Sequence, residues 1–421
     1  MTKLSRPCAT HAPRRGSILV VVVVVIAMMT VAGMAYFEWT FTERRASKLY
    51  GRQMQTRALA DSGVELARAL LTRDPQVIQQ EGGLYVNPTW FQGYLLADNE
   101  QAALRARVSL VAPLEDNGDF IGYRFGLENE SARLNLNTLL LADNYVEDGA
   151  RTQLMSLPGM TESIADAILD WMDEDDEVRP FGAELTYYSS LETPLAPQNG
   201  PLECLEQLLL VRDVTPALLY GLDTNRNHVI DGAEALAQLP PEVDNSNGAM
   251  NRGWSAYLTL YSAEANLNPD GEPKINVNME DLEELHTQLA DALGPDKANF
   301  IVAYRQGGAA DEDSTLPTVS PSTATMDYSL PGSETVSSLL DLIGVNVEFS
   351  DNGQAAVMTS PFPAESGSAR TYLPELLDEL TVSAEASTPG RLNINQAPRV
   401  LLYGVPNMPP EVVEQLIATR M

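Results

Sequence analysis

The chain has 421 residues, 44% of them hydrophobic, which is enough for two or three folded domains and excludes a wholly disordered protein. Its 27 basic and 58 acidic residues give a net charge of −31, and residues 1–16 hold basic groups without an acid, so the rest is more negative still. A surface this acidic repels phosphate backbones and attracts cations, which argues against nucleic acid and in favour of divalent metal.

A basic stretch followed by an uncharged apolar run opens the chain. Residues 17–37 carry no charge, and about 20 apolar residues at 1.5 Å each span a bilayer core. The basic residues before this run favour a cytoplasmic N-terminus, with the chain after Glu38 in the periplasm. No proline occurs between Glu38 and Arg73, so we predict one helix over residues 17–71 that starts in the inner membrane and then packs on a globular domain.

The residues RRG before SIL, with Gly16 and Ser17 at the junction, resemble the cleavage site of type IV pilins and pseudopilins. The resemblance implies that a prepilin peptidase cuts between Gly16 and Ser17, leaves the apolar segment in the membrane, and removes Cys8, so that Cys204 has no partner for a disulfide. Val21 stands at the fifth mature position, where most members carry glutamate, and the lack of this glutamate is typical of minor pseudopilin K. The alternatives are a plain signal anchor and a secretory signal, whose apolar region is shorter, about 7–15 residues.

Alternating apolar and polar residues predict strands after the helix. Leu104–Ala112 and Phe120–Leu127 alternate around an Asp-Asn-Gly turn at residues 116–118, and Trp254–Ser262 is a further candidate. A long N-terminal helix packed on a small antiparallel sheet is the pilin-like fold. We therefore predict an α+β protein with an inserted helical domain between its strands.

An apolar-Asn-apolar-Asn pattern occurs at residues 134–137, 275–278 and 392–395, each time before a helical segment. The motifs LPGM (157–160) and VPNM (405–408) supply a glycine or asparagine for the positive φ of a turn between two short helices. These units resemble helix-hairpin-helix modules, which in many proteins bind DNA. Acidic residues crowd the exit of the first hairpin and would repel phosphate, so we favour packing units.

These signals divide the chain into seven segments. They are a prepilin leader at 1–16, the transmembrane helix at 17–37, the pilin-like helix and first strands at 38–138, an inserted α-domain with an EF-hand-like loop at 139–251, a return strand and second helix-hairpin-helix-like unit at 252–306, a loop-rich linker at 307–390 that includes the small polar residues 366–369, and a third helix-hairpin-helix-like unit at 391–421. Because the sequence stops at the end of a predicted helix, a truncated C-terminus is one expectation.

The sharpest chemical signal is the segment DTNRNHVIDGAE at residues 223–234. It follows the ligand order of a calcium-binding EF-hand, with a glutamate in the last place. The predicted ligands are Asp223, Asn225, Asn227, the Val229 carbonyl, Asp231 and Glu234. His228 replaces the usual glycine, but histidine tolerates positive φ. Helices are expected on both sides, over 216–222 and 233–239; the alternative is a polar turn between two helices.

A second candidate is an acidic stretch after the first hairpin. Its carboxylates are Asp173, Asp175, Asp176, Glu177 and Glu184. Such crowding is costly without a cation, because like charges disfavour ionisation. The alternative is a solvated acidic loop, and the sequence leaves both open.

Five motifs occur within residues 134–222: LNLNT (134–138), LPGM (157–160), ADAILDWMDEDDE (165–177), GAELTYY (182–188) and PLECLEQLLLVRDVTPALLYGL (201–222). Together they resemble the minor pseudopilin K family of type II secretion systems, although Asp213 stands where the family commonly has glycine. The resemblance implies calcium in the α-domain and a structural role at the pseudopilus tip. Its implied partners are the minor pseudopilins I and J and the secretion assembly platform.

Two other functions compete with this interpretation. A membrane-anchored DNA-uptake protein would use the helix-hairpin-helix units, but the acidic charge disfavours it. An enzyme is disfavoured because the sequence has no nucleophile elbow, P-loop or zinc spacing, and His11, His228 and His286 offer no usable pair.

Overall fold

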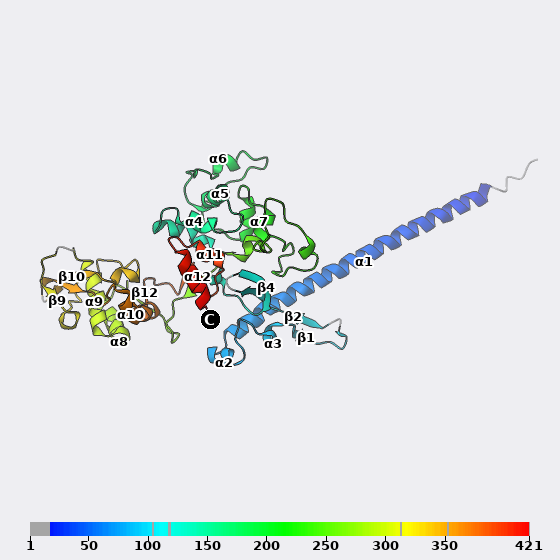
Figure 1. The fold of residues 1–421 in the computed structure, drawn as a ribbon. Helices are drawn as coiled ribbons and strands as arrows, with labels where there is room; N and C mark the ends of the chain where they lie inside the picture. Colours follow the sequence, from blue (N-terminus) through cyan, green and yellow to red (C-terminus); the bar gives the residue numbers. More distant parts are fainter. Residues whose placement is uncertain (1–16, 103–104, 117–118, 312–313, 352, 421) are drawn as a thin grey trace, which may run out of the picture. The chain divides into compact units, whose positions relative to one another are not determined.

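A computed structural model describes residues 17–102, 105–116, 119–311, 314–351 and 353–420 (Figure 1). The chain divides into two compact units. The first comprises the residues up to Ala112 together with Arg124–Leu127, and the second comprises Pro113–Tyr123 and everything from Glu128 onward. The predicted leader, including Gly16, lies outside the described residues.

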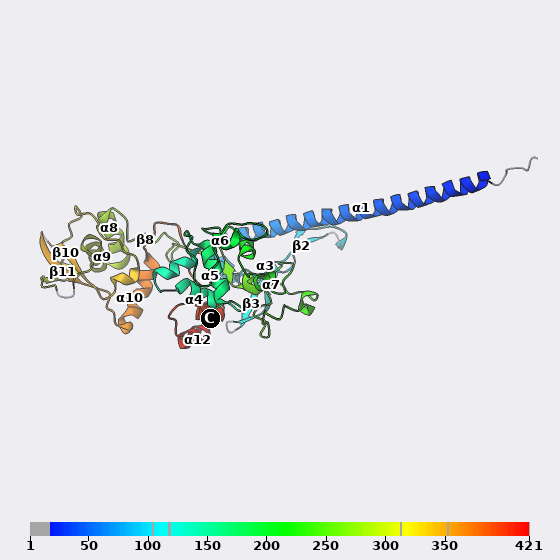
Figure 2. The same ribbon diagram turned by 90° about the horizontal axis from the view of Figure 1, so that it is seen from above.

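The first unit is dominated by α1 (Ser17–Leu71), a helix of 55 residues with the bounds predicted from the sequence (Figures 1 and 2). Its N-terminal half is long and apolar enough to cross a membrane. The apolar side chains there are exposed, for example Ile18 at 71% and Met29 at 70%. This half therefore has no protein core to pack into, as expected of a segment that a bilayer surrounds.

The C-terminal half of α1 packs on a small antiparallel pair of strands. The further elements of this unit are α2 (Pro75–Gln80), α3 (Pro88–Phe91), β1 (Tyr94–Ala97) and β2 (Ala106–Val108). Gly63 lets the helix approach the sheet, since a Cβ at this position would lie 2.7 Å from a methyl group of Val108. Helix-on-sheet packing thus follows the predicted fold class.

The predicted strands are shorter than the alternating pattern suggested. The segment predicted as one strand over 104–112 is split between β2 and the start of β3 (Val111–Asp116), which pairs with β4 (Asp119–Phe125). The tip of the predicted turn, residues 117–118, lies outside the described residues.

The predicted return strand over Trp254–Ser262 is wrong in extent. Residues 253–256 form a 3-10 helix, and the strand β6 is limited to Leu258–Thr259. Trp254 belongs to this 3-10 helix; its side chain is fully buried and its indole N–H donates to the Pro158 carbonyl at 2.8 Å. β6 pairs in parallel with β5 (Leu134–Asn135).

Residues 134–265 form a first repeat within the second unit. Its helices are α4 (Gly149–Met155), α5 (Glu162–Met172), α6 (Leu185–Tyr188) and α7 (Pro216–Tyr220). The α4–α5 turn contains Gly159 with φ +71°, as the LPGM motif predicts. The core between these helices includes Leu154, Ile168, Trp171, Tyr188 and Leu219.

Residues 275–386 form a second repeat, whose α8, α9, β10 and β11 gather together in Figure 2. Its elements are β8 (Ile275–Asn276), α8 (Leu282–Leu293), α9 (Pro295–Gly307), β9 (Thr318–Val319), β10 (Asn346–Asp351), β11 (Gln354–Thr359), α10 (Ser366–Glu379) and β12 (Leu380–Thr381). The sheet order is β10-β11-β9, with β10 and β11 antiparallel.

The predicted linker over 307–390 is therefore wrong. Phe349, Met358, Phe362 and Tyr372 are all buried in one core with Phe300 of α9, and residues 366–369 begin α10 instead of forming a loop. The sparse apolar residues of this segment converge on the helical hairpin, so a polar composition did not indicate a loop.

The two repeats share one construction. β8 pairs in parallel with β12, as β5 does with β6, and each pair joins an apolar-Asn strand to a Leu-Thr strand. The sequence Ser-Ala-Glu-Ala follows both Leu-Thr strands, at 262–265 and 383–386. The repeat ends meet through the antiparallel pair β7 (Ala263–Ala265) and β13 (Ser387–Pro389).

A third hairpin segment follows within the second unit, at residues 391–420. Its hairpin consists of α11 (Arg399–Tyr403) and α12 (Pro410–Thr419), joined by a turn in which Asn407 has φ +59°. The hairpin encloses a small core of Ala397, Leu402, Val413 and Ile417.

Candidate metal sites

The loop at residues 223–234 begins where α7 ends. Thr215 caps the helix by accepting the Leu218 N–H, and Gly221 ends it with φ +60°. A Cβ at Gly221 would lie 1.9 Å from the Met250 carbonyl oxygen, so this position requires glycine.

This close approach creates a backbone seam between residues 221–223 and 250–253. The N–H groups of Leu222 and Asp223 both donate to the Asn251 carbonyl, at 2.8 and 3.3 Å. The seam fixes the backbone of the first predicted ligand, Asp223, before the loop begins.

The backbone of the loop has the turn that the sequence required. His228 adopts φ +63°, which confirms the positive φ expected at the glycine position of an EF-hand. The segment after the loop differs from the predicted helix over 233–239, because only residues 234–236 are helical and they form a 3-10 helix.

The side chains of the loop converge through hydrogen bonds. The buried Asp223 carboxylate accepts the N–H groups of Asn227 at 3.1 Å and His228 at 2.9 Å. The buried Glu234 carboxylate accepts the N–H groups of Asn225 at 3.1 Å and Asp231 at 3.2 Å. The first and last predicted ligands therefore organise the backbone of the whole loop.

The remaining predicted ligands lie between these two carboxylates. The Asn225 amide donates to Asp231 Oδ2 at 3.2 Å, and Asn227 Oδ1 accepts the Val229 N–H at 2.8 Å. Burial acts to raise the pKa of Glu234, but the N–H donors of Asn225 and Asp231 outweigh it and the pKa is lowered. Glu234 is thus held as a carboxylate, the form that a calcium ion binds.

Among the described residues, no group of three or more His, Cys, Asp or Glu side chains is placed to hold a metal ion. The loop offers a mixed set, with two asparagine amides and a backbone carbonyl beside three carboxylates. Such neutral oxygen donors are ordinary calcium ligands in EF-hand loops.

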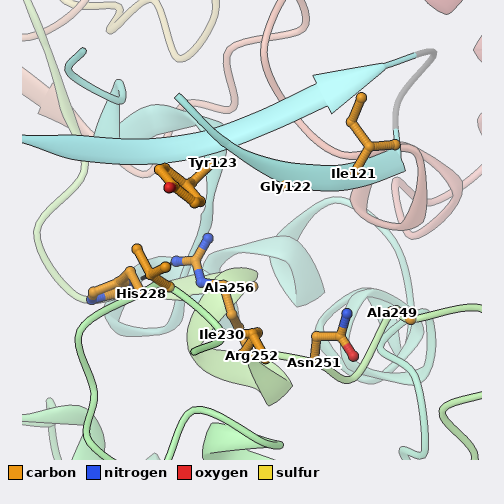
Figure 3. A pocket seen from close by; sticks show the side chains of 11 residues that line it. Ile121, Gly122, Tyr123, His228, Ile230, Ala249, Asn251, Arg252 and Ala256 are labelled. Atoms are coloured by element: carbon orange, nitrogen blue, oxygen red, sulfur yellow. Dashed lines mark hydrogen bonds between the residues drawn. The ribbon is translucent and has the colours of Figure 1, made fainter. Parts of the chain in front are cut away.

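A cavity of about 340 Å³ adjoins the loop (Figure 3). Tyr123 of β4 lies on one side, with His228 and Arg252 facing it, and the Arg252 guanidinium lies 2.6 Å from His228 Nδ1. Val229 also lines this cavity, and the described residues in its walls include no aspartate or glutamate. Of the six predicted ligands, Val229 alone is among the described residues that line the cavity.

The second candidate centres on the end of α5. Asp170 is completely buried, and Asp173 and Glu184 are 9% and 5% exposed. Arg179 Nη1 donates to Asp170 Oδ1 at 2.9 Å and also pairs with Asp173. Gly182 permits this arrangement, since a Cβ there would lie 1.8 Å from Asp170 Oδ2.

Several oxygens here are buried without a hydrogen-bond donor. Both carboxylate oxygens of Glu184, Asp173 Oδ1 and Asn199 Oδ1 lack a donor in the described structure. Burial, and then the charges of Asp170 and Asp173, raise the pKa of Glu184 to about 7. Burial also raises the pKa of Asp173 against the opposing effect of Arg179. Unpaired buried oxygens of this kind suit a hard cation.

The other three predicted residues lie at the exposed rim. Asp175, Asp176 and Glu177 are exposed, and the Asn199 amide donates to the Asp175 carbonyl at 3.2 Å and to Asp176 Oδ1 at 3.3 Å. The structure thus brings Asp173 and Glu184 together but leaves these three on the adjoining loop.

Sequence reasoning missed Asp170, Arg179 and Asn199 as members of this cluster. Asp170 lies in the last turn of α5, three residues before the C-cap residue Asp173, and this spacing was an available signal. No local pattern indicated Asn199, which is more than twenty residues away from its partners in the chain.

The sequence model described as type II secretion system (T2SS), protein K, matches residues 132–224, which include α4 to α7 and the first residues of the loop. No curated protein and no solved structure gives a significant match.

Proposed function

The chain belongs to the type II secretion system protein K family through its residues 132–224, and we propose that it is the minor pseudopilin at the tip of the secretion pseudopilus. Membership gives it a role as a pseudopilin in protein transport, and α1 fits a single-pass anchor in the inner membrane. The protein works by assembly with other pseudopilus components rather than by catalysis.

The observation that carries this proposal is the family match combined with the pilin-like form of the first unit. A 55-residue helix whose apolar half is exposed provides an assembly stem, and the large second unit is too bulky to repeat along a thin fibre. Val21, in place of the usual glutamate, fits a subunit with no neighbour above it whose amine needs a counter-charge. Minor pseudopilins I and J and the assembly platform are the proposed partners.

Labelled pseudopili test the tip position. In cells that overproduce the major pseudopilin, a gold-labelled tag on this chain should mark one end of each fibre, and the same tag on the major pseudopilin should mark its length. Label from this chain along the whole fibre would contradict the tip assignment.

The leader and the orientation are tested together in the native cell. Gly16→Leu should leave residues 1–16 attached, and normal processing of this variant would refute cleavage by a prepilin peptidase. Protease added outside the inner membrane should digest the chain beyond residue 38. A protected chain would contradict the proposed periplasmic location.

We also propose that this protein binds calcium at two places in the first repeat. Asp223, Asn225, Asn227, Val229, Asp231 and Glu234 would hold one ion, and Asp170, Asp173, Glu184 and Asn199 would contribute to the other. Supporting observations are the loop turn at His228 and the donorless oxygens of Glu184. Bound calcium would supply positive charge that offsets the buried carboxylates.

The acidic charge of the chain does not favour the alternative function in DNA uptake. At low salt, the full chain should show no salt-sensitive binding to duplex DNA, and such binding would revive that alternative.

A further inference from the structure

The third apolar-Asn-apolar-Asn segment, residues 392–395, has no paired strand among the described residues, whereas each of the first two segments pairs with a parallel strand. In the first repeat the Leu134 N–H donates to the Tyr257 carbonyl at 2.8 Å, and in the second the Val277 N–H donates to the Thr381 carbonyl at 3.0 Å. Both bonds belong to parallel pairs with a Leu-Thr strand. The apolar residue between the asparagines, Leu136 or Val277, is completely buried.

The corresponding residue of the third segment is Ile394, and it is 48% exposed. Within the described parts of the chain, the backbone N–H groups of Leu392 and Ile394 have no hydrogen-bond acceptor, and the Leu392 carbonyl has no donor. These are the groups that the first two segments direct at their parallel partner strands. The Ile394 carbonyl, which that pairing does not use, accepts from Arg420 Nε at 2.8 Å.

The second asparagine shows the same difference. The Asn137 side chain exchanges two hydrogen bonds with the Leu202 backbone, at 2.8 and 3.0 Å. The Asn278 side chain does the same with the Val336 backbone, at 2.9 and 3.0 Å. The side-chain amide of Asn395 is exposed and makes no hydrogen bond to another described residue.

The third segment nevertheless has the local shape of the first two. Asn393 Oδ1 accepts the Asn395 N–H at 3.0 Å, as Asn135 and Asn276 do for their second neighbours. The Asn393 N–H is anchored to the Ser131 carbonyl at 2.7 Å. The strand edge is therefore preformed, and binding a strand to it would cost little ordering of this chain.

We propose that residues 392–394 form a docking edge for an extended segment of another polypeptide, which adds as a parallel strand and carries an apolar residue followed by threonine. The occupied repeats define this chemistry. Leu258 and Leu380 are buried under their repeats, and Thr259 and Thr381 each use the hydroxyl to accept an N–H two residues later, at 3.1 and 3.2 Å. Backbone bonds give such strand addition its affinity and the alternating side chains give its specificity.

A peptide from the chain itself is the first probe. A fluorescent peptide of residues 378–386, which contains the Leu380-Thr381 strand, should bind the detergent-solubilised full chain, and the same peptide with proline in place of threonine should not, because it lacks the N–H donor. Failure of the threonine peptide to bind, or equal binding of both peptides, would overturn the proposal.

A matched pair of variants locates the binding edge. Ile394→Asp should weaken peptide binding about tenfold, because it places a charge beside the added strand. Val412→Asp places the same charge in α12 at a residue that is 38% exposed and outside residues 392–394, and it should leave binding unchanged. Equal effects of the two variants would show that the peptide binds elsewhere, for instance by displacing β12.

Cross-linking identifies the natural occupant. A photoreactive residue at position 394, but not at 412, should cross-link in intact cells to a segment of another protein with an apolar-Thr pattern. Cross-links of position 394 to this same polypeptide, including any residues that follow 421 in a longer form, would overturn the proposal, as would equal yields at both positions.

Discussion

The two repeats of the second unit have the same frame but different interiors. The first repeat buries six carboxylates: Asp166, Asp170, Asp173, Glu184, Asp223 and Glu234. Among the described residues of the second repeat, no aspartate or glutamate is buried, and its core is apolar around Phe300 and Phe362. Both repeats have an apolar core, so the shared pair of strands and helical hairpin can be built with or without buried carboxylates beside that core.

Truncation of the apolar core should have the largest effect. Phe300→Ala removes a completely buried ring that packs against Phe362 at 5.9 Å between centroids, and should destabilise the second repeat by about 3–5 kcal/mol. Hydrogen exchange should show lost protection over residues 275–386, with residues 134–265 nearly unchanged. Equal loss in both repeats would show that they unfold as one.

Calcium removal should produce the next largest effect, confined to the first repeat. Excess calcium at about 100 times its Kd stabilises a single-site protein by about 2.7 kcal/mol, so a chelator should lower the melting temperature. Asp223→Ala should remove most of the loop's share of this response. The control Asp291→Ala, an exposed aspartate of α8, should leave it intact, and an unchanged response in Asp223→Ala would refute the loop as a site.

The raised pKa of Glu184 predicts a dependence on pH. Its carboxyl binds a proton more tightly in the folded state, with a pKa of about 7 against 4.5. In the calcium-free protein, the contribution of this proton to the free energy of unfolding is therefore complete below pH 4.5 and is lost as the pH rises through 7. The loss should be of the order of 2 kcal/mol between pH 5 and pH 8. Glu184→Gln should flatten this dependence in chelator, and an unchanged slope would assign it to another group.

The smallest predicted effect concerns a turn in the first repeat. Asp213 has φ +65°, a conformation that glycine adopts without strain. Asp213→Gly should raise the free energy of unfolding by about 0.5 kcal/mol, whereas Asp213→Ala should lower it, because alanine has neither the freedom of glycine nor the local hydrogen bonding of aspartate. Urea unfolding of both variants would reveal the opposite signs, and equal signs would contradict strain at this turn.

Patterns among neighbouring residues in the sequence predicted the helix α1 and the turn of the loop at 223–234. An uninterrupted helical segment of 55 residues and a ligand order fixed over twelve positions are local patterns that tertiary contacts need not alter. The positive φ of His228 and Asn407 followed from the turns their motifs required.

The second repeat and the acidic cluster depended on contacts that a linear pattern does not carry. A strand of two residues, such as β8 or β12, is too short to show a period, so residues 307–390 resembled a linker. Glu184 lies near Asp170, which is fourteen residues before it in the chain, where Gly182 packs directly against the Asp170 carboxylate. In both places, the composition showed that the segment is polar, but contacts between residues far apart in the chain determined its structure.

The seam beside the loop has a mechanical consequence. Asn251 accepts two backbone N–H groups from residues 222–223, and the chain then continues from Asn251 to β6 within a few residues. A force that separates β6 from β5 would be transmitted to the Asp223 backbone through these hydrogen bonds, because only a few residues connect Asn251 to β6. Tension on β6 and the shape of the loop are therefore coupled, so a load applied to the repeat would change the spacing of the proposed calcium ligands that follow Asp223.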